Sequence, residues 1–152
     1  MELSEEIVGL VPLLFHRLKA VGDELNKEHQ VTTSMRGVMQ SLFNGEPRTV
    51  PQLAAARPVS RQHIQTIVDT LLERGLVQQI ANPSHKRSNL IDLTEEGCEL
   101  FVKMREAELQ ILRSTLGRIS ASDLEITQTV LSRFAAQLAH IIQTQKETGN
   151  DD

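Results

Sequence analysis

Two helical patterns in the middle of the chain are joined by a turn of only three residues and a cap residue, and this spacing constrains the fold more than any other feature. The first, Pro51–Ala56, opens on a proline, which suits a first helical turn, and its alanines let another helix approach closely. The second begins after Ser60, a typical N-cap residue, and ends near Arg74, before a glycine suited to a helix end. Because the turn Arg57–Val59 is so short, we expect the two helices to form a helix-turn-helix unit.

Two short strand patterns follow this unit directly. Leu76–Ala81 and Ser88–Leu93 flank the turn-rich segment Asn82–Arg87, which ends in two adjacent cations, Lys86 and Arg87. This pattern predicts a β-hairpin with a basic tip. A helix-turn-helix followed by such a hairpin is a winged helix-turn-helix, so the predicted fold class is mainly α with a small β-hairpin wing.

Amphipathic helices are predicted on both sides of the winged unit. Apolar residues spaced alternately four and three apart indicate a helix over Ser4–Glu28, in which Pro12 predicts a kink or a late start. A second helix follows Thr32 or Thr33, and two more helices occupy the chain beyond Thr94. The predicted element order is therefore α-α-α-α-β-β-α-α.

The first, fifth and sixth helices carry more apolar surface than one thin domain can bury. We therefore expect them to pack against a second copy of the chain, in a homodimer. The predicted division is an N-terminal dimerisation helix over residues 1–31, a winged helix-turn-helix domain over residues 32–93, and C-terminal dimerisation helices over residues 94–152.

The composition argues against several classes of site. Aromatic residues make up 3% of the chain, which disfavours a carbohydrate platform or a surface that stacks single-stranded bases. The single cysteine, Cys98, excludes an internal disulfide, and we favour an inert buried thiol over a redox sensor. The histidines show no metal-ligand spacing, so no metal or other cofactor is expected, and a metal site assembled across a dimer is the open alternative.

No apolar run is long enough to span a bilayer, and the acidic N-terminus lacks the basic start of a signal peptide. We therefore expect a soluble cytoplasmic protein that does not associate with membranes. The sequence shows no nucleophile–base pair, glycine-rich phosphate loop or carboxylate constellation, so we do not expect an enzyme.

Charge is unevenly distributed along the chain. The whole chain has a net charge of −4, but residues 32–93 carry seven basic and four acidic side chains, a net charge of +3. The remaining residues together carry −7. A basic middle between acidic ends is typical of a DNA-contacting module carried on a scaffold that does not touch DNA.

The helix after Ser60 has the composition of a recognition helix. Its apolar positions Ile64, Ile67, Val68, Leu71 and Leu72 are predicted to face inward. We expect its opposite face to meet base edges in the major groove, because Arg pairs with guanine, Gln with adenine, and Thr can contact a thymine methyl. The candidate residues for base or phosphate contact on this face are Arg61, Gln62, His63, Gln65 and Thr66.

Other candidate contacts lie around this helix. Ser60, with the backbone amides near it, can hold a phosphate, and Arg87 or Lys86 at the hairpin tip is placed to enter the minor groove. Ser34 and Arg36, early in the second helix, are candidate phosphate contacts, with a plain solvated surface as the alternative. Pro51 and Gln52, at the start of the third helix, are also candidate phosphate contacts with the same alternative.

The middle of the chain resembles the MarR (multiple antibiotic resistance regulator) family. The resemblance rests on the run from Val59 to Val77, with its Leu-Leu-Glu-Arg-Gly-Leu-Val ending, on the wing segment Asn82–Arg87, and on Leu-Thr-Glu-Glu-Gly at 93–97. It implies a homodimer held by N- and C-terminal helices. It also implies binding to palindromic operators in double-stranded DNA, often as a repressor released by a small aromatic ligand.

The chain departs from the family pattern at two positions. The family wing usually reads Asp-x-Arg, and Arg87 matches the arginine, but His85 stands where the aspartate would be. Gln79 stands where many members carry a basic residue. Both changes are expected to weaken phosphate contacts or to alter their salt dependence.

The resemblance also implies a ligand pocket where the dimerisation helices meet the DNA-binding part. Phe15, His16, Met39 and Phe43 are the candidates to line it, although ordinary core packing is the favoured interpretation of these residues. The alternative to a regulator is a winged-helix protein-interaction module without DNA binding. Such a module would be expected to have an acidic recognition face and no wing cation, and neither mark is present.

Overall fold

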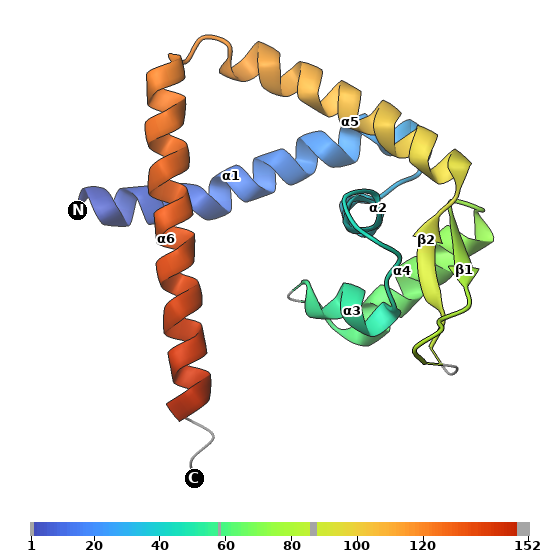
Figure 1. Ribbon diagram of the computed structural model, residues 1–152. Coiled ribbons are helices and arrows are strands. Elements are labelled where there is room, and N and C mark those ends of the chain that lie inside the picture. The colour runs from blue at the N-terminus through green and yellow to red at the C-terminus, as the bar shows by residue number, and fades with distance from the viewer. Residues whose placement is uncertain (1, 58, 86–87, 149–152) are drawn as a thin grey trace. The chain divides into compact units, whose positions relative to one another are not determined.

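The computed structural model describes residues 2–57, 59–85 and 88–148 (Figure 1). A helix α1 and a short 3-10 helix η1 precede the helices α2, α3 and α4, the antiparallel strands β1 and β2, and the helices α5 and α6. The predicted element order and fold class are confirmed. The bounds are α1 Leu3–Leu25, η1 Lys27–His29, α2 Thr33–Phe43, α3 Val50–Ala55, α4 Arg61–Glu73, β1 Val77–Ile80, β2 Leu90–Leu93, α5 Glu95–Leu116 and α6 Ala121–Thr148.

The chain forms two compact units, Met1–Leu109 and Gln110–Asp152, with the boundary inside α5. The first unit holds α1, the winged helix-turn-helix and most of α5. The second holds the end of α5 and α6, which begins after Ser120. The Ser120 hydroxyl accepts a hydrogen bond from the Asp123 amide and so caps the start of α6.

Helix α1 runs without interruption through Pro12, so the predicted late start is wrong. The helix already begins at Leu3, and proline costs a helix one backbone hydrogen bond wherever it lies beyond the first turn. Every residue from Glu2 to Val21 is exposed in the single chain. None of the described helices is both long and apolar enough to cross a membrane.

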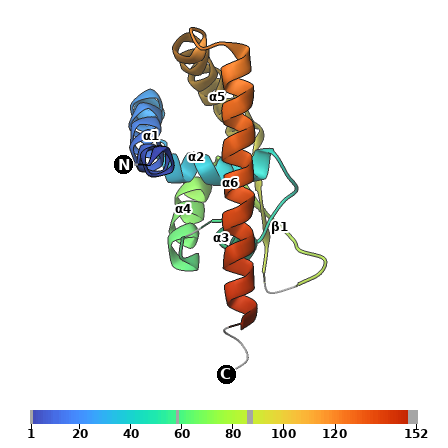
Figure 2. The ribbon, with the colours of Figure 1, turned by 90° about the vertical axis from the view of Figure 1, so that its left-hand side faces the viewer.

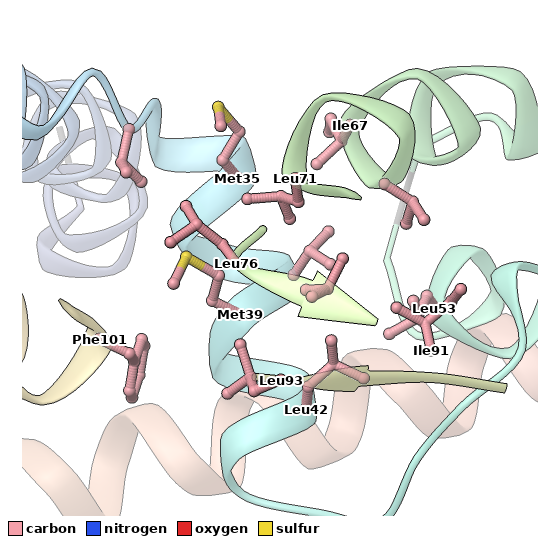
Figure 3. Close-up of a cluster of buried hydrophobic side chains, with 14 of the residues drawn as sticks. Met35, Met39, Leu42, Leu53, Ile67, Leu71, Leu76, Ile91, Leu93 and Phe101 are labelled. Atoms are coloured by element: carbon pink, nitrogen blue, oxygen red, sulfur yellow. The ribbon is translucent and has the colours of Figure 1, made fainter. Parts of the chain in front are cut away.

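The hydrophobic core lies between α2, α4, the hairpin and the first half of α5 (Figure 3). Helix α4 contributes to the core the apolar face that was predicted to point inward. Within that face, Leu72 is only partly buried. Met39 and Leu42 of α2 enclose the core from a second side, and Phe101 of α5 from a third. Burial of a large apolar side chain contributes about 1.5–3 kcal/mol, so this core is what holds α4 in place.

The wing is an antiparallel pair in which Val77 faces Leu93 and Ile80 faces Leu90. Both strands are shorter than predicted. The hairpin leads away from α2 in both ribbon views (Figures 1 and 2). A third segment pairs with β2, because the amide and carbonyl of Arg48 bond to the carbonyl and amide of Ile91, at 3.0 and 2.8 Å. A single bridging residue leaves no alternating pattern, so the sequence did not predict it.

The turn from α4 into the wing is a Schellman motif. Gly75 adopts a left-handed φ of 68°, its amide donates to the Leu72 carbonyl, and the Leu76 amide donates to the Leu71 carbonyl, both at 3.0 Å. The Thr94 hydroxyl then donates to the Gly75 carbonyl at 2.7 Å and accepts from the Gly97 amide at 3.0 Å. These contacts fix α4, the wing and the start of α5 to one another.

Helix α1 is attached to α2 by Asp23, whose carboxylate accepts hydrogen bonds from the amide and hydroxyl of Thr33. Hydrogen bonds from Lys19 and Thr33 hold the pKa of this carboxyl below its ordinary value. The carboxylate therefore contributes stability that is present above the ordinary aspartate pKa of about 3.9 and is lost as pH falls through the lowered value.

We expect Asp23→Asn to destabilise the protein at pH 6 and to be nearly neutral at a pH low enough to protonate Asp23 in the folded chain. Urea unfolding of both proteins, at one protein concentration, measures the difference at each pH. A difference that stays constant down to pH 2 would show that the charge of Asp23 contributes nothing.

Candidate nucleic-acid interface

Helix α4 is held so that one face is buried and the other is open. The Ser60 hydroxyl accepts a hydrogen bond from the His63 amide at 3.1 Å, which caps the helix as predicted. Ile64, Val68 and Leu71 are at most 1% exposed. The predicted contact residues on the opposite face are exposed, except Gln65, which is half-buried.

The first turn of α4 presents polar side chains that are available for hydrogen bonds to a ligand. Within the part of the chain that the structure describes, the side chains of Arg61, Gln62 and His63 have no hydrogen-bond or ion-pair partner. An arginine guanidinium and a glutamine amide in this state can each make paired hydrogen bonds to a base edge.

In the second turn of α4, the predicted contact residues already make hydrogen bonds within the helix. Gln65 Nε2 donates to Asp69 at 2.8 Å, and the Thr66 hydroxyl donates to the Gln62 carbonyl at 3.1 Å. The Thr66 methyl keeps the ability to meet a thymine methyl, but Gln65 would first have to leave Asp69. The arrangement therefore favours Arg61, Gln62 and His63 as the main reading residues.

The turn between α3 and α4 is held by the side chain of Arg57. Its guanidinium donates to the Gly37 carbonyl and, at 3.0 Å, to the Ser41 hydroxyl, both on α2. A Cβ on Gly37 would lie 2.2 Å from the guanidinium, so this glycine makes room for it. Burial, and then the charge of Arg36, lowers the pKa of Arg57. The pairing joins residues twenty apart, so no local pattern predicts it.

Arg36, a predicted phosphate contact, is engaged inside the protein. Its Nε donates to Glu108 of α5 at 2.5 Å, and its Nη1 to Gln40 at 2.7 Å. The guanidinium also lies 5.3 Å from the centre of the Phe101 ring, a cation–π distance. We therefore do not retain Arg36 as a DNA contact, whereas Ser34 lies exposed in the first turn of α2.

The positive charge of the middle segment is consequently smaller at the surface than the sequence count suggests. Arg36, Arg57 and Arg74 all donate hydrogen bonds to other parts of the chain. Among the described arginines of this segment, Arg61 and Arg48 are the two whose side chains make no such hydrogen bond. An open polar hollow beside Arg48 is lined by Glu46, Pro47, Arg48 and Gln52.

The start of α3 is a complete capping box. Thr49 accepts from the Gln52 amide, and the Gln52 side-chain oxygen accepts from the Thr49 amide at 2.8 Å. Pro51 is half-buried in the first turn and Gln52 is exposed. The Gln52 amide nitrogen keeps its capacity to donate to a phosphate.

The predicted wing cations, Lys86 and Arg87, lie outside the described residues. The loop on either side of them is closed by Asn82, which donates to the Ser88 carbonyl at 2.9 Å and accepts from the Ser84 amide at 3.0 Å. The exposed His85 stands just before the cations. At the other family departure, the Gln79 side chain accepts from Asn89 across the strands at 2.9 Å.

The four predicted pocket residues fall in two different environments. Phe15 is 61% exposed and its ring lies 5.5 Å from that of His16, whereas Met39 is completely buried. Phe43 packs against Phe101 with ring centres 4.7 Å apart. Met39 and Phe43 thus belong to the core or its edge, and Phe15 and His16 to the open surface of α1.

Cys98 lies half-buried in the first turns of α5. Burial, then the nearby carboxylates of Asp92 and Glu95, raises the pKa of its thiol. A raised pKa keeps the group in its weakly reactive protonated form, in keeping with an inert cysteine. The described residues contain no cluster of metal-ligand side chains.

Comparison with known proteins finds that the chain is similar to transcription regulators. A family model described as MarR family matches residues 42–88. An uncharacterized protein of Mycobacterium tuberculosis is 28% identical over 138 residues, 90% of this chain and 96% of the relative. The HTH-type transcriptional repressor NicR of Pseudomonas putida is 25% identical over 80% of this chain and 77% of its own. A crystal structure of a MarR family transcription regulator superposes with a TM-score of 0.80 and 28% identity, covering 90% of this chain and 92% of that one.

Proposed function

We propose that the chain is a transcriptional repressor of the MarR family of winged helix-turn-helix regulators, and that it places α4 in the major groove of double-stranded DNA. The observation that carries this proposal is the first turn of α4, where Arg61, Gln62 and His63 are exposed and uncommitted on a helix held rigidly by the core. Ser60 and the start of α3 supply phosphate contacts, and Arg87 or Lys86 enters the minor groove.

We propose that the repressor is a homodimer that binds a palindromic operator. Helix α1 has no buried residue in the single chain, although it carries many large apolar side chains. In the other compact unit, Ile126, Ile141 and Ile142 of α6 are each more than half exposed. Exposed apolar surface of this extent is typical of a buried subunit interface. A two-fold dimer presents two copies of α4 and therefore favours a two-fold symmetric site.

The remaining parts of the proposal rest on the family resemblance. Release from the operator by a small aromatic ligand would involve Phe15 and His16, which the single chain leaves open. We assign the protein to the cytoplasm, where its DNA lies, and assign it no catalytic activity. A winged-helix interaction module without DNA binding is the alternative, and the operator experiment below separates the two.

We expect Arg61→Ala to lower affinity for the operator by about 10-fold and to relax its sequence preference, because one paired base contact is worth about 1–3 kcal/mol. Arg87→Ala is expected to weaken binding by a similar factor while the dimer stays intact. The operator is the duplex that the protein enriches from a random pool, and fluorescence anisotropy measures the affinity.

Arg105→Ala is the matched control, since Arg105 is an exposed arginine on α5, away from the proposed interface. Its affinity should equal that of the unsubstituted protein. If Arg61→Ala and Arg105→Ala bound the operator equally well, the placement of α4 in the groove would be wrong. Light scattering after gel filtration shows whether each variant keeps its oligomeric state.

A further inference from the structure

The end of the recognition helix is tied directly to the segment that follows α1. Arg74, the C-cap residue of α4, donates from Nη1 to the Gln30 carbonyl and from Nη2 to the His29 carbonyl, both at 2.7 Å. A guanidinium holds two neighbouring acceptors in one geometry because its donors form a rigid planar fork. The contact spans 44 and 45 residues of sequence and bridges α4 to η1.

The turn that accepts these hydrogen bonds, at His29 and Gln30, has an uncommon backbone conformation. Gln30 has a φ of 51° and is the only non-glycine residue with positive φ among those described. Left-handed backbone is unfavourable for such a residue, so it persists where the surroundings impose it. Val31, the next residue, is 3% exposed and anchors the chain in the core. Arg74 therefore bonds to a turn of defined conformation.

The other attachments of the α1 end reach different elements. Asp23 bonds to Thr33 at the start of α2. Asn26, which is 2% exposed, bonds to Glu108 of α5 at 3.2 Å. Arg74 is the described residue whose side chain carries the connection from this turn to α4 itself.

We propose that Arg74 is a positioning residue that sets how far apart the two recognition helices stand, and therefore which half-site spacing the dimer accepts. This rests on the proposed function, in which α1 belongs to the dimer interface and α4 reads a half-site. In such a dimer, each recognition helix is joined to α1 of its own subunit by the hydrogen bonds of Arg74, and the two copies of α1 join the subunits. When the Arg74 hydrogen bonds are lost, the end of α4 stays joined to the wing and α5 but no longer to the turn that follows α1, and the spacing is less sharply defined.

The test compares operators that differ only in the spacing of their half-sites. One inserted base pair moves a half-site by about 3.4 Å and turns it by roughly a tenth of a turn. For the unsubstituted protein we expect a loss of about 10- to 100-fold in affinity, comparable with a poorly placed base contact. For Arg74→Met we expect the same inserted base pair to lower the affinity by less than about 5-fold.

Controls separate a positioning role from a merely structural one. Arg105→Met removes an exposed arginine from α5 and should discriminate spacings like the unsubstituted protein. Arg74→Lys keeps the charge and hydrogen-bond donors but lacks the planar fork, so it should restore part of the discrimination. Arg74→Gln replaces Arg74→Met if that variant does not fold. The readout is the ratio between two operators, which a uniform loss of stability does not change.

Equal discrimination by the folded Arg74 variants and the unsubstituted protein would overturn the inference and leave DNA binding intact. So would an unsubstituted protein that accepts both spacings equally. Failure of the unsubstituted protein to bind any duplex would instead remove the proposed function, and the inference with it. Reduced discrimination in Arg74→Met alone, with recovery in Arg74→Lys, is the result that supports the assignment.

Discussion

Replacing Gly97 by alanine is expected to lower the free energy of unfolding by about 3 kcal/mol, because the added methyl group has no space. A Cβ at this position would lie 2.0 Å from the Leu76 carbonyl oxygen and 2.9 Å from its carbonyl carbon. That oxygen already accepts the Thr94 amide at 3.1 Å, and the Gly97 amide bonds to the Thr94 hydroxyl. Neither backbone can withdraw without breaking the junction between α4, the wing and α5.

Urea unfolding followed by circular dichroism measures this effect. Gly22→Ala is the matched control, because Gly22 lies in α1 beyond its fully exposed stretch and a Cβ there would come no closer than 4.0 Å to another side chain. That control should be neutral or stabilising by up to about 1 kcal/mol, as glycine is a poor helix former. If both variants unfolded at the same urea concentration, the close approach at Gly97 would not constrain the fold.

Removing the carboxylate of Glu108 is expected to cost about 3 kcal/mol of stability. Its two oxygens accept hydrogen bonds from the guanidinium of Arg36, and one also accepts from Asn26. Both side chains of the ion pair are only 18% exposed. Glu108→Ala therefore leaves a largely buried guanidinium unpaired, which is far more costly than the loss of a surface ion pair.

Glu106→Ala, an exposed position on the same helix, is the control and should change stability by less than about 0.5 kcal/mol. A double-mutant cycle with Arg36→Met isolates the pair, and we expect a coupling of more than about 1 kcal/mol. Additive effects of the two substitutions would show that the ion pair contributes no specific stabilisation. The cycle thus tests directly how α2 and α5 are joined.

The parts of the fold that could be predicted from sequence depend on local contacts. The caps at Thr32, Thr49 and Ser60 bond to amides three residues ahead, and Gly75 ends α4 with bonds to carbonyls a few residues back. Such signals are complete within one stretch of sequence. The apolar face of α4 was also predicted, because helical periodicity places its members on one side.

The parts that were not predicted depend on partners distant in sequence. Arg36, Arg57 and Arg74 look alike as charges, and only the folded chain places carboxylate or carbonyl oxygens of other elements around each guanidinium. The bridge at Arg48 is one residue long, below the length that an alternating pattern needs. The sequence therefore predicted which face of α4 is exposed, but it counted too many free cations around that face.

The central claim, that the protein recognises a DNA sequence, is tested most directly by titrating it with the duplex it enriches from a random pool. A scrambled duplex of the same composition serves as control, and both titrations are repeated across salt concentrations. The account predicts affinity for the enriched duplex at least about 1,000-fold above the control, falling steeply with salt as phosphate contacts release counterions. Equal affinity for both duplexes, or no enriched sequence at all, would contradict it.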